Sequence, residues 1–238
     1  MKNEQDERLP EVRVTARLEE LAELSTHLLK MVEGERAQLA KKLHDELGGM
    51  ITAAKMDMQW LSGHIGPSLD AKGLEKFNSV VQMLDQAMML KRRVVETLRP
   101  SLLDHFGLSV AMRSHFEEHC RQAGIECVSS VPEETLQLDP AAQLSLFRVA
   151  QDVLAGIIAR GGAGHVEMVV EPQHEKGIDG YLMTIGDDAA APDDDASSSL
   201  LIARHRVTLA GGHIETESRA GSGNQVRVFV PRSAAGSA

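Results

Sequence analysis

Apolar side chains recur at steps of three and four residues through the first hundred positions, and this spacing limits the fold more than any other feature of the chain. It is typical of a helix that packs lengthwise against other helices. The residues on this spacing are Leu39, Leu43, Leu47, Met50, Ala54, Met58, Leu61 and Ile65. The same spacing continues upstream to Leu18, so we predict one long helix from Thr15 to Ile65.

A second helix is predicted after the turn sequence Gly66-Pro67-Ser68, because Gly and Pro interrupt helices. The apolar face of this helix is formed by Phe77, Val81, Leu84, Met88, Val95 and Leu98. Pro100 ends it. Two long antiparallel helices cannot bury both of their apolar faces against each other alone. We therefore expect a homodimer in which two such hairpins form a four-helix bundle.

The pattern changes after Leu108, where short helices and strands alternate. Helices are predicted over 111–122 and 141–159, and strands over 125–128, 165–170, 181–185 and 225–230. Residues 187–199 are rich in Asp, Ala and Ser, which predicts a mobile loop. Helices mixed with antiparallel strands indicate an α+β fold, with an α/β sandwich following the helical hairpin.

His44 and Asp45 stand side by side in the long helix. His44 lies about 100° around the helix from Leu43, so it flanks the apolar seam and can reach solvent. A neutral imidazole is a good nucleophile and phosphoryl acceptor. A neighbouring carboxylate can take its proton or fix its tautomer. A neighbouring His and Asp on a helix are more often a solvated surface pair than a catalytic pair. The surrounding sequence motifs are therefore needed to assign a function to His44 and Asp45.

Three motifs carry a resemblance to one family. The run from Glu35 to Lys55 resembles the phosphoacceptor helix of the NarL-partner class of bacterial two-component histidine kinases, roughly E-R-x-x-I-A-R-E-L-H-D-x-L-G-Q-x-L-T-A-x-K. The run from Leu98 to Leu108 resembles L-R-P-x-x-L-D-x-x-G-L, which joins the hairpin to the ATPase-like domain in that family. Residues 146–152 resemble a third motif, L-y-R-i-x-Q-E.

The resemblance implies a domain plan and a set of site residues. The plan is a flexible N-terminus (1–14), a dimerisation and phosphoacceptor hairpin (15–100), a degenerate ATPase-like domain (101–232) and a flexible tail (233–238). His44 is implied as the phosphoacceptor and Asp45 as the general base or orienting group. The implied partner is the receiver domain of a NarL/LuxR-type response regulator. Gly49 stands where phosphatase-competent members carry Gln, which indicates either lost water positioning or a neutral substitution.

The nucleotide-binding positions implied by the resemblance are altered. The replacements are Gly156 for the metal-holding Asn, Arg160 for a His, and Ala189 and Ala191 for two glycines. Asp187 matches the Asp that reads adenine, but the run Asp193 to Asp195 adds carboxylates that repel phosphate. We therefore expect a degenerate ATP site with Asp187 as its vestige, no bound cofactor and no metal site.

Composition narrows the choice of function. A net charge of −10 argues against an electrostatic nucleic-acid surface. The two cysteines, Cys120 and Cys127, make no disulfide framework, which fits a reducing cytosol. No continuous apolar run approaches 18 residues and the N-terminus has no signal-peptide pattern, so we expect a cytoplasmic protein without a membrane span.

These features favour a histidine phosphotransfer protein of a two-component phosphorelay. His44 would pass phosphoryl groups to or from receiver domains, with a phosphoaspartate rather than ATP as the donor. Two alternatives stay open. One is an ATP-dependent sensor histidine kinase with a divergent nucleotide pocket. The other is a non-catalytic pseudokinase that binds a response regulator.

Overall fold

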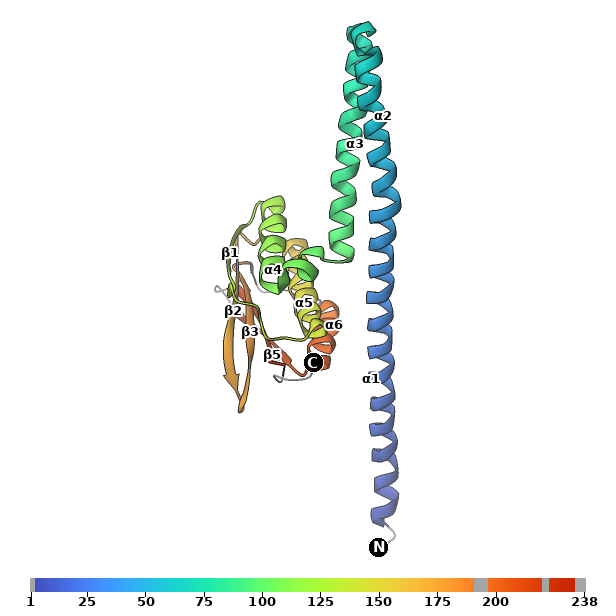
Figure 1. The fold of residues 1–238 in the computed structure, drawn as a ribbon. Coiled ribbons are helices and arrows are strands. Elements are labelled where there is room, and N and C mark those ends of the chain that lie inside the picture. The colour runs from blue at the N-terminus through green and yellow to red at the C-terminus, as the bar shows by residue number, and fades with distance from the viewer. Residues whose placement is uncertain (1–2, 191–196, 220–222, 234–238) are drawn as a thin grey trace. The chain divides into compact units, whose positions relative to one another are not determined.

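The computed structural model describes residues 3–190, 197–219 and 223–233, which divide into two compact units at Pro100 and Ser101. The first unit is helical (Figure 1). Its elements are α1 (Asn3–Lys42), the π-helical turn η1 (Leu43–Leu47), α2 (Gly48–Ile65), the 3-10 turn η2 (Gly66–Ser68) and α3 (Ala71–Leu98). The long helix therefore begins at Asn3 rather than Thr15, because the charged N-terminal residues are themselves good helix formers.

The hairpin is closed by the turn predicted at Gly66-Pro67-Ser68. Asp70 caps α3, since its side chain accepts a hydrogen bond from the Gly73 amide at 2.8 Å. α3 then runs back along α2 and the adjoining part of α1 (Figure 1). The predicted apolar face of α3 is confirmed, because all six of its predicted residues are partly buried.

The apolar pattern of the long helix separates into two neighbouring stripes. Ala40, Gly48 and Ile51 are buried inside the hairpin. Leu39, Leu47 and Met50, which were predicted to share the packed face, remain exposed on the isolated hairpin. Between Leu39 and Met50 lies the π-helical turn, which holds an extra residue and shifts the helical phase between the two halves of the helix.

The second unit is an α/β sandwich. Its elements are α4 (Ser101–Ala123), β1 (Glu126–Ser130), α5 (Pro140–Arg160), β2 (His165–Glu175), β3 (Ile178–Asp187), α6 (Ser197–Leu209), β4 (His213–Arg219) and β5 (Gly223–Pro231). The five strands form one sheet in the order β1-β2-β3-β5-β4, and the helices cover one of its faces (Figure 1). The sheet is mixed rather than purely antiparallel, because α5 connects β1 to β2 and leaves them parallel.

The core of this unit lies between the helices and the sheet. Its fully buried side chains include Phe116, Met112, Leu146, Leu154, Met168, Met183 and Ile185. α5 supplies much of this core, and it is also the one helix among the described residues that is long and apolar enough to cross a membrane. Half of that apolar window is buried inside the unit, as expected of a core helix.

The loop predicted over residues 187–199 is shorter at both ends in the structure. Asp187 is the last residue of β3, paired with Asn224 of β5. Residues 197–199 already belong to α6. Alanine and serine following the acidic run support a helix start, which explains the difference. The acidic run Asp193 to Asp195 and Ala191 lie outside the described residues.

Candidate functional site

The predicted site residues lie in both units: His44 and Asp45 in the first, and Asp187 in the second. In the first unit His44 occupies the π-helical turn η1. The Gly48 amide closes this turn by donating to the carbonyl oxygens of Leu43 and Asp45. Such turns occur often at functional sites in helices. The His44 side chain is exposed, and no described residue forms a hydrogen bond or ion pair with its ring.

Asp45 follows His44 in the same turn and is also exposed. The structure holds no hydrogen bond between these two side chains within the residues that it describes. Because the two residues are neighbours in the chain, rotation of their side chains can bring the Asp45 carboxylate close to the His44 ring. Orientation of His44 by Asp45 therefore stays a prediction.

In the second unit Asp187 is held by three donors from three places in the chain. Its Oδ2 accepts from Arg160 Nη2 at 2.8 Å, and its Oδ1 accepts from the Ala189 amide and from Asn224 Nδ2, each at 3.0 Å. The Asp187 side chain is 3% exposed and that of Arg160 is 28% exposed. A buried carboxylate needs such partners. We call this set of four residues the Asp187 clasp.

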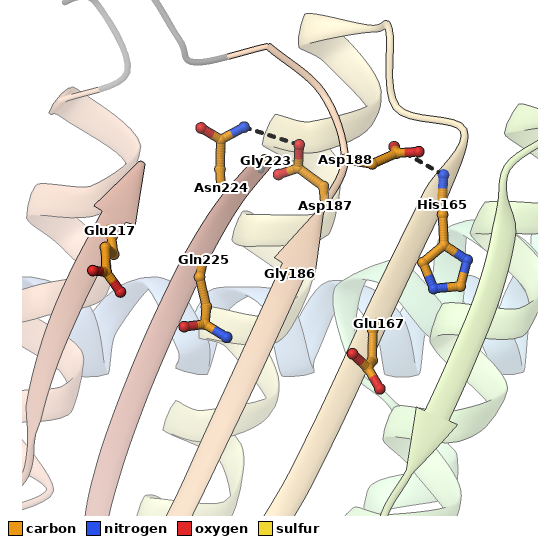
Figure 2. Close-up of a pocket in the computed structure, with 9 residues that line it drawn as sticks. All are labelled: His165, Glu167, Gly186, Asp187, Asp188, Glu217, Gly223, Asn224 and Gln225. Atoms are coloured by element: carbon orange, nitrogen blue, oxygen red, sulfur yellow. Dashed lines mark hydrogen bonds between the residues drawn. The ribbon is translucent and has the colours of Figure 1, made fainter. Parts of the chain in front are cut away.

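The clasp joins the end of α5 to the adjoining ends of β3 and β5. Figure 2 shows Asn224 directed at Asp187 from the neighbouring strand. The strands can approach this closely because position 223 is glycine with φ 84°, and a Cβ there would lie 1.9 Å from the Asp187 carbonyl oxygen. Gly223 therefore holds β5 against the end of β3.

A cavity of about 560 Å³ lies beside the clasp. It is lined by Asp152, Val153, Gly156, Ile157, Arg160, Asp187, Leu200, Thr216, Glu217, Ser218, Asn224, Gln225 and Val226. Gly156 faces open space, since a Cβ at this position would meet nothing within 4 Å. The cavity is large enough for a nucleotide, but Gly156 offers no side-chain oxygen for a metal ion.

A smaller cavity of about 300 Å³ opens on the sheet beside the same strand ends (Figure 2). Asp188 lies at its rim and accepts hydrogen bonds from the Gly164 and His165 amides at 2.8 and 3.0 Å. These bonds to the backbone amides of His165 and Gly164 lower the pKa of Asp188. Asp188 therefore fixes the beginning of β2 and is engaged with backbone.

Sequence reasoning named Asp187 but missed its partners. Arg160 was noted as a replacement without a role, and its contact with Asp187 spans 27 positions in the sequence. Asn224 lies 37 positions from Asp187 in the sequence, just before the strand predicted over 225–230. Arg160 stands where the family carries a His, and this basic side chain could have indicated a partner for the Asp187 carboxylate. Lys91, which is buried beside Gly48, was missed as well.

Comparisons with known proteins point to one family. Residues 35–103 match the family model HisKA_3, described as histidine kinase. Sensor histidine kinase MctS of Rhizobium johnstonii is 26% identical over 73% of this chain. The signal transduction histidine-protein kinase/phosphatase UhpB of Salmonella typhimurium is 27% identical over 88% of it. The kinase/phosphatase DegS of Brevibacillus brevis is 21% identical over 86% of it.

The matched relatives are much longer than this chain, which spans 36% of MctS, 41% of UhpB and 53% of DegS. One solved structure that matches is the histidine kinase domain from Erythrobacter litoralis EL346 blue-light activated histidine kinase. It has a TM-score of 0.47 and 15% identity, and the match covers 74% of this chain and 96% of that one.

Proposed function

Because this chain belongs to the NarL-partner class of bacterial two-component histidine kinases, we propose that His44 carries a phosphoryl group and exchanges it with the receiver domain of a NarL/LuxR-type response regulator. The observation that carries the proposal is the exposed, unpartnered His44 ring within the described part of a matched phosphoacceptor helix. An exposed ring leaves a nitrogen lone pair open to a docked phosphoaspartate.

The transfer needs little beyond positioning. A ring nitrogen of His44 attacks phosphorus while the acyl P–O bond of the phosphoaspartate breaks, and the aspartate leaves as a carboxylate. The remaining ring N–H can then lose its proton to Asp45. Reversal of the same step returns the phosphoryl group to a receiver.

We further propose that this exchange runs without ATP. The residues present do not fit Mg-ATP, because the Asp187 carboxylate already has three protein donors and Gly156 supplies no metal ligand. Three of the roughly four acceptor positions of the carboxylate are occupied, so an adenine amino group would have to compete with Arg160, Ala189 and Asn224 for it. This supports a phosphotransfer protein fed by a phosphoaspartate.

A second candidate is an ATP-dependent sensor histidine kinase with a divergent pocket. The names of the matched relatives favour it over the ATP-free proposal, since MctS, UhpB and DegS are all called kinases. The cavity of about 560 Å³ beside the clasp supports it as well. The two candidates share His44 and differ in the phosphoryl donor.

We also propose that the chain acts as a homodimer through its hairpin. Leu21, Leu24, Leu28 and Met31 are each about half exposed on α1, and Leu47 and Met50 extend the stripe. A row of apolar side chains at helical spacing is stabilised when a second hairpin covers it.

One experiment separates the candidates. The full chain is mixed with a NarL-class receiver phosphorylated by a small-molecule donor, and separately with radioactive ATP and Mg²⁺. Label on wild-type protein from the receiver but not from ATP supports the ATP-free proposal, whereas label from ATP supports the kinase. His44→Gln should lose all label, while His27→Gln, which replaces another exposed histidine of the same helix, should keep it. Absence of label from both donors overturns both candidates and favours a pseudokinase that only binds the regulator.

A further inference from the structure

Lys91 is a charged residue in an apolar position. It stands on α3 in the row formed by Leu84, Met88 and Val95, which are partly buried. Lys91 itself is only 7% exposed. The side chain of Lys91 is therefore almost fully covered, and a charged group in such a place is stabilised by a nearby counter-charge. Within the described residues, however, no hydrogen bond or ion pair to the Lys91 ammonium is found.

The Lys91 ammonium is directed at the helix that carries His44. A Cβ placed on Gly48 would lie 2.8 Å from Lys91 Nζ, so the missing side chain of Gly48 makes the space for the ammonium. α3 contacts the π-helical turn as well as α2. The positive charge is therefore held against the end of the turn that contains His44.

This charge lies beside the turn of the helix that carries His44. The Gly48 amide donates across the π-helical turn to the Leu43 carbonyl oxygen, so Gly48 lies one turn beyond Leu43 and its neighbour His44. The Cα–Cβ direction in a helix tilts towards the N-terminus, so the Cβ direction of Gly48 points back over the turn of His44. Lys91 Nζ lies close to that Cβ position.

We propose that Lys91 binds the phosphoryl group while it is attached to His44. A phosphohistidine carries up to two negative charges at neutral pH, which is a counter-charge that no described residue supplies to the Lys91 ammonium. The ammonium lowers the free energy of the dianion, and it positions the phosphoryl oxygens for the next transfer. This inference rests on the proposed function, because it requires His44 to carry the phosphoryl group.

The test loads His44 chemically with phosphoramidate, so that no partner protein is needed, and follows the phosphohistidine by ³¹P NMR during a pH titration. Lys91→Met should raise the second pKa of the phosphoryl group by about 0.7 of a pH unit, because it removes a favourable charge interaction worth about 1 kcal/mol for an ion pair in water. Lys91→Arg should keep the wild-type value. Lys76→Met, on an exposed lysine of the same helix, is the matched control and should leave it unchanged.

Gly48→Ala provides a second variant that keeps the charge. The new Cβ must push the Lys91 ammonium away, so the phosphoryl pKa should rise part of the way towards that of Lys91→Met. Methionine is a close apolar replacement for a buried lysine stem, so Lys91→Met is expected to fold. An unchanged phosphoryl pKa in both variants overturns the role of Lys91 while leaving His44 as the acceptor. Failure of wild-type His44 to form any phosphohistidine overturns both.

Discussion

At the scale of single residues, the Asp187 clasp is the clearest departure from a nucleotide-reading site. The carboxylate is almost fully buried and its oxygens face protein donors. Within the described residues, Arg160 supplies the positive charge paired with this carboxylate. A residue that would otherwise face a ligand thus contributes to the stability of the unit.

We predict that Arg160→Met lowers the free energy of unfolding by about 2 to 3 kcal/mol, because it leaves a buried carboxylate without its charged partner. The value is below that of a fully buried pair, since Arg160 is 28% exposed. Urea unfolding followed by circular dichroism measures it. Arg227→Met, on an exposed arginine of β5, is the control and should change little. Equal stability of the two variants would show that the clasp is not structural.

At the scale of elements, the contact between α4 and α5 contains His115, whose ring is neutral in the folded protein. Burial, followed by the nearby charges of His119 and Arg148, lowers the pKa of His115 from 6.5 to about 3. Its ring lies edge-on to Phe147 of α5, with 5.5 Å between ring centroids. Protonation of this ring would place a charge in the contact between the two helices.

The free energy of unfolding should therefore depend on pH, because His115 binds its proton at different pH values in the folded and unfolded chain. In the unfolded chain His115 binds a proton below pH 6.5, whereas in the folded chain it does not until about pH 3. Stability from the neutral ring is therefore present above pH 6.5 and is lost as the pH falls, by about 2 kcal/mol at pH 5. Urea unfolding at pH 7.5 and 5.0 should show a smaller loss for His115→Leu than for wild type. His105→Leu, on an exposed histidine of α4, should behave as wild type.

Elements were easier to predict than the contacts between them. The six apolar positions on α3 follow from local spacing alone, and the structure packs all of them. The π-helical turn was not predictable, because Leu43 to Leu47 have ordinary helical composition and the extra residue shows only in the hydrogen bonds. The Arg160–Asp187 pair was not predictable either, since it depends on how α5 meets β3. Lys91 did leave a signal, because it interrupts an apolar row.

At the scale of the whole molecule, the exposed apolar stripe of the first unit makes a prediction about assembly. Leu47 is 37% exposed on the isolated hairpin, so Leu47→Asp should be harmless to a single chain. In a dimer the same change would bury an unpaired carboxylate. We predict a wild-type dimer and a Leu47→Asp monomer at micromolar concentration by light scattering coupled to size exclusion. Met56→Asp, on an exposed residue outside the stripe, should remain dimeric. A monomeric wild type would rule out the four-helix bundle.

The π-helical turn has a consequence for anyone who joins this chain to another protein. Because η1 shifts the helical phase at His44, the rotation of α1 and that of α2 are set separately. When the helix of another protein is fused upstream of Leu43, its apolar face has to be aligned with that of α1. Alignment with the apolar face of α2 would place it at the wrong rotation. Loss of one residue within Leu43 to Leu47 would return the helix to even α-helical winding. The segment beyond the deletion would keep its rotation relative to α1, because η1 already accommodates one extra residue. Straightening η1 without a deletion would instead turn that segment by about 100°, which is enough to swing Gly48 away from the lysine that fills its gap.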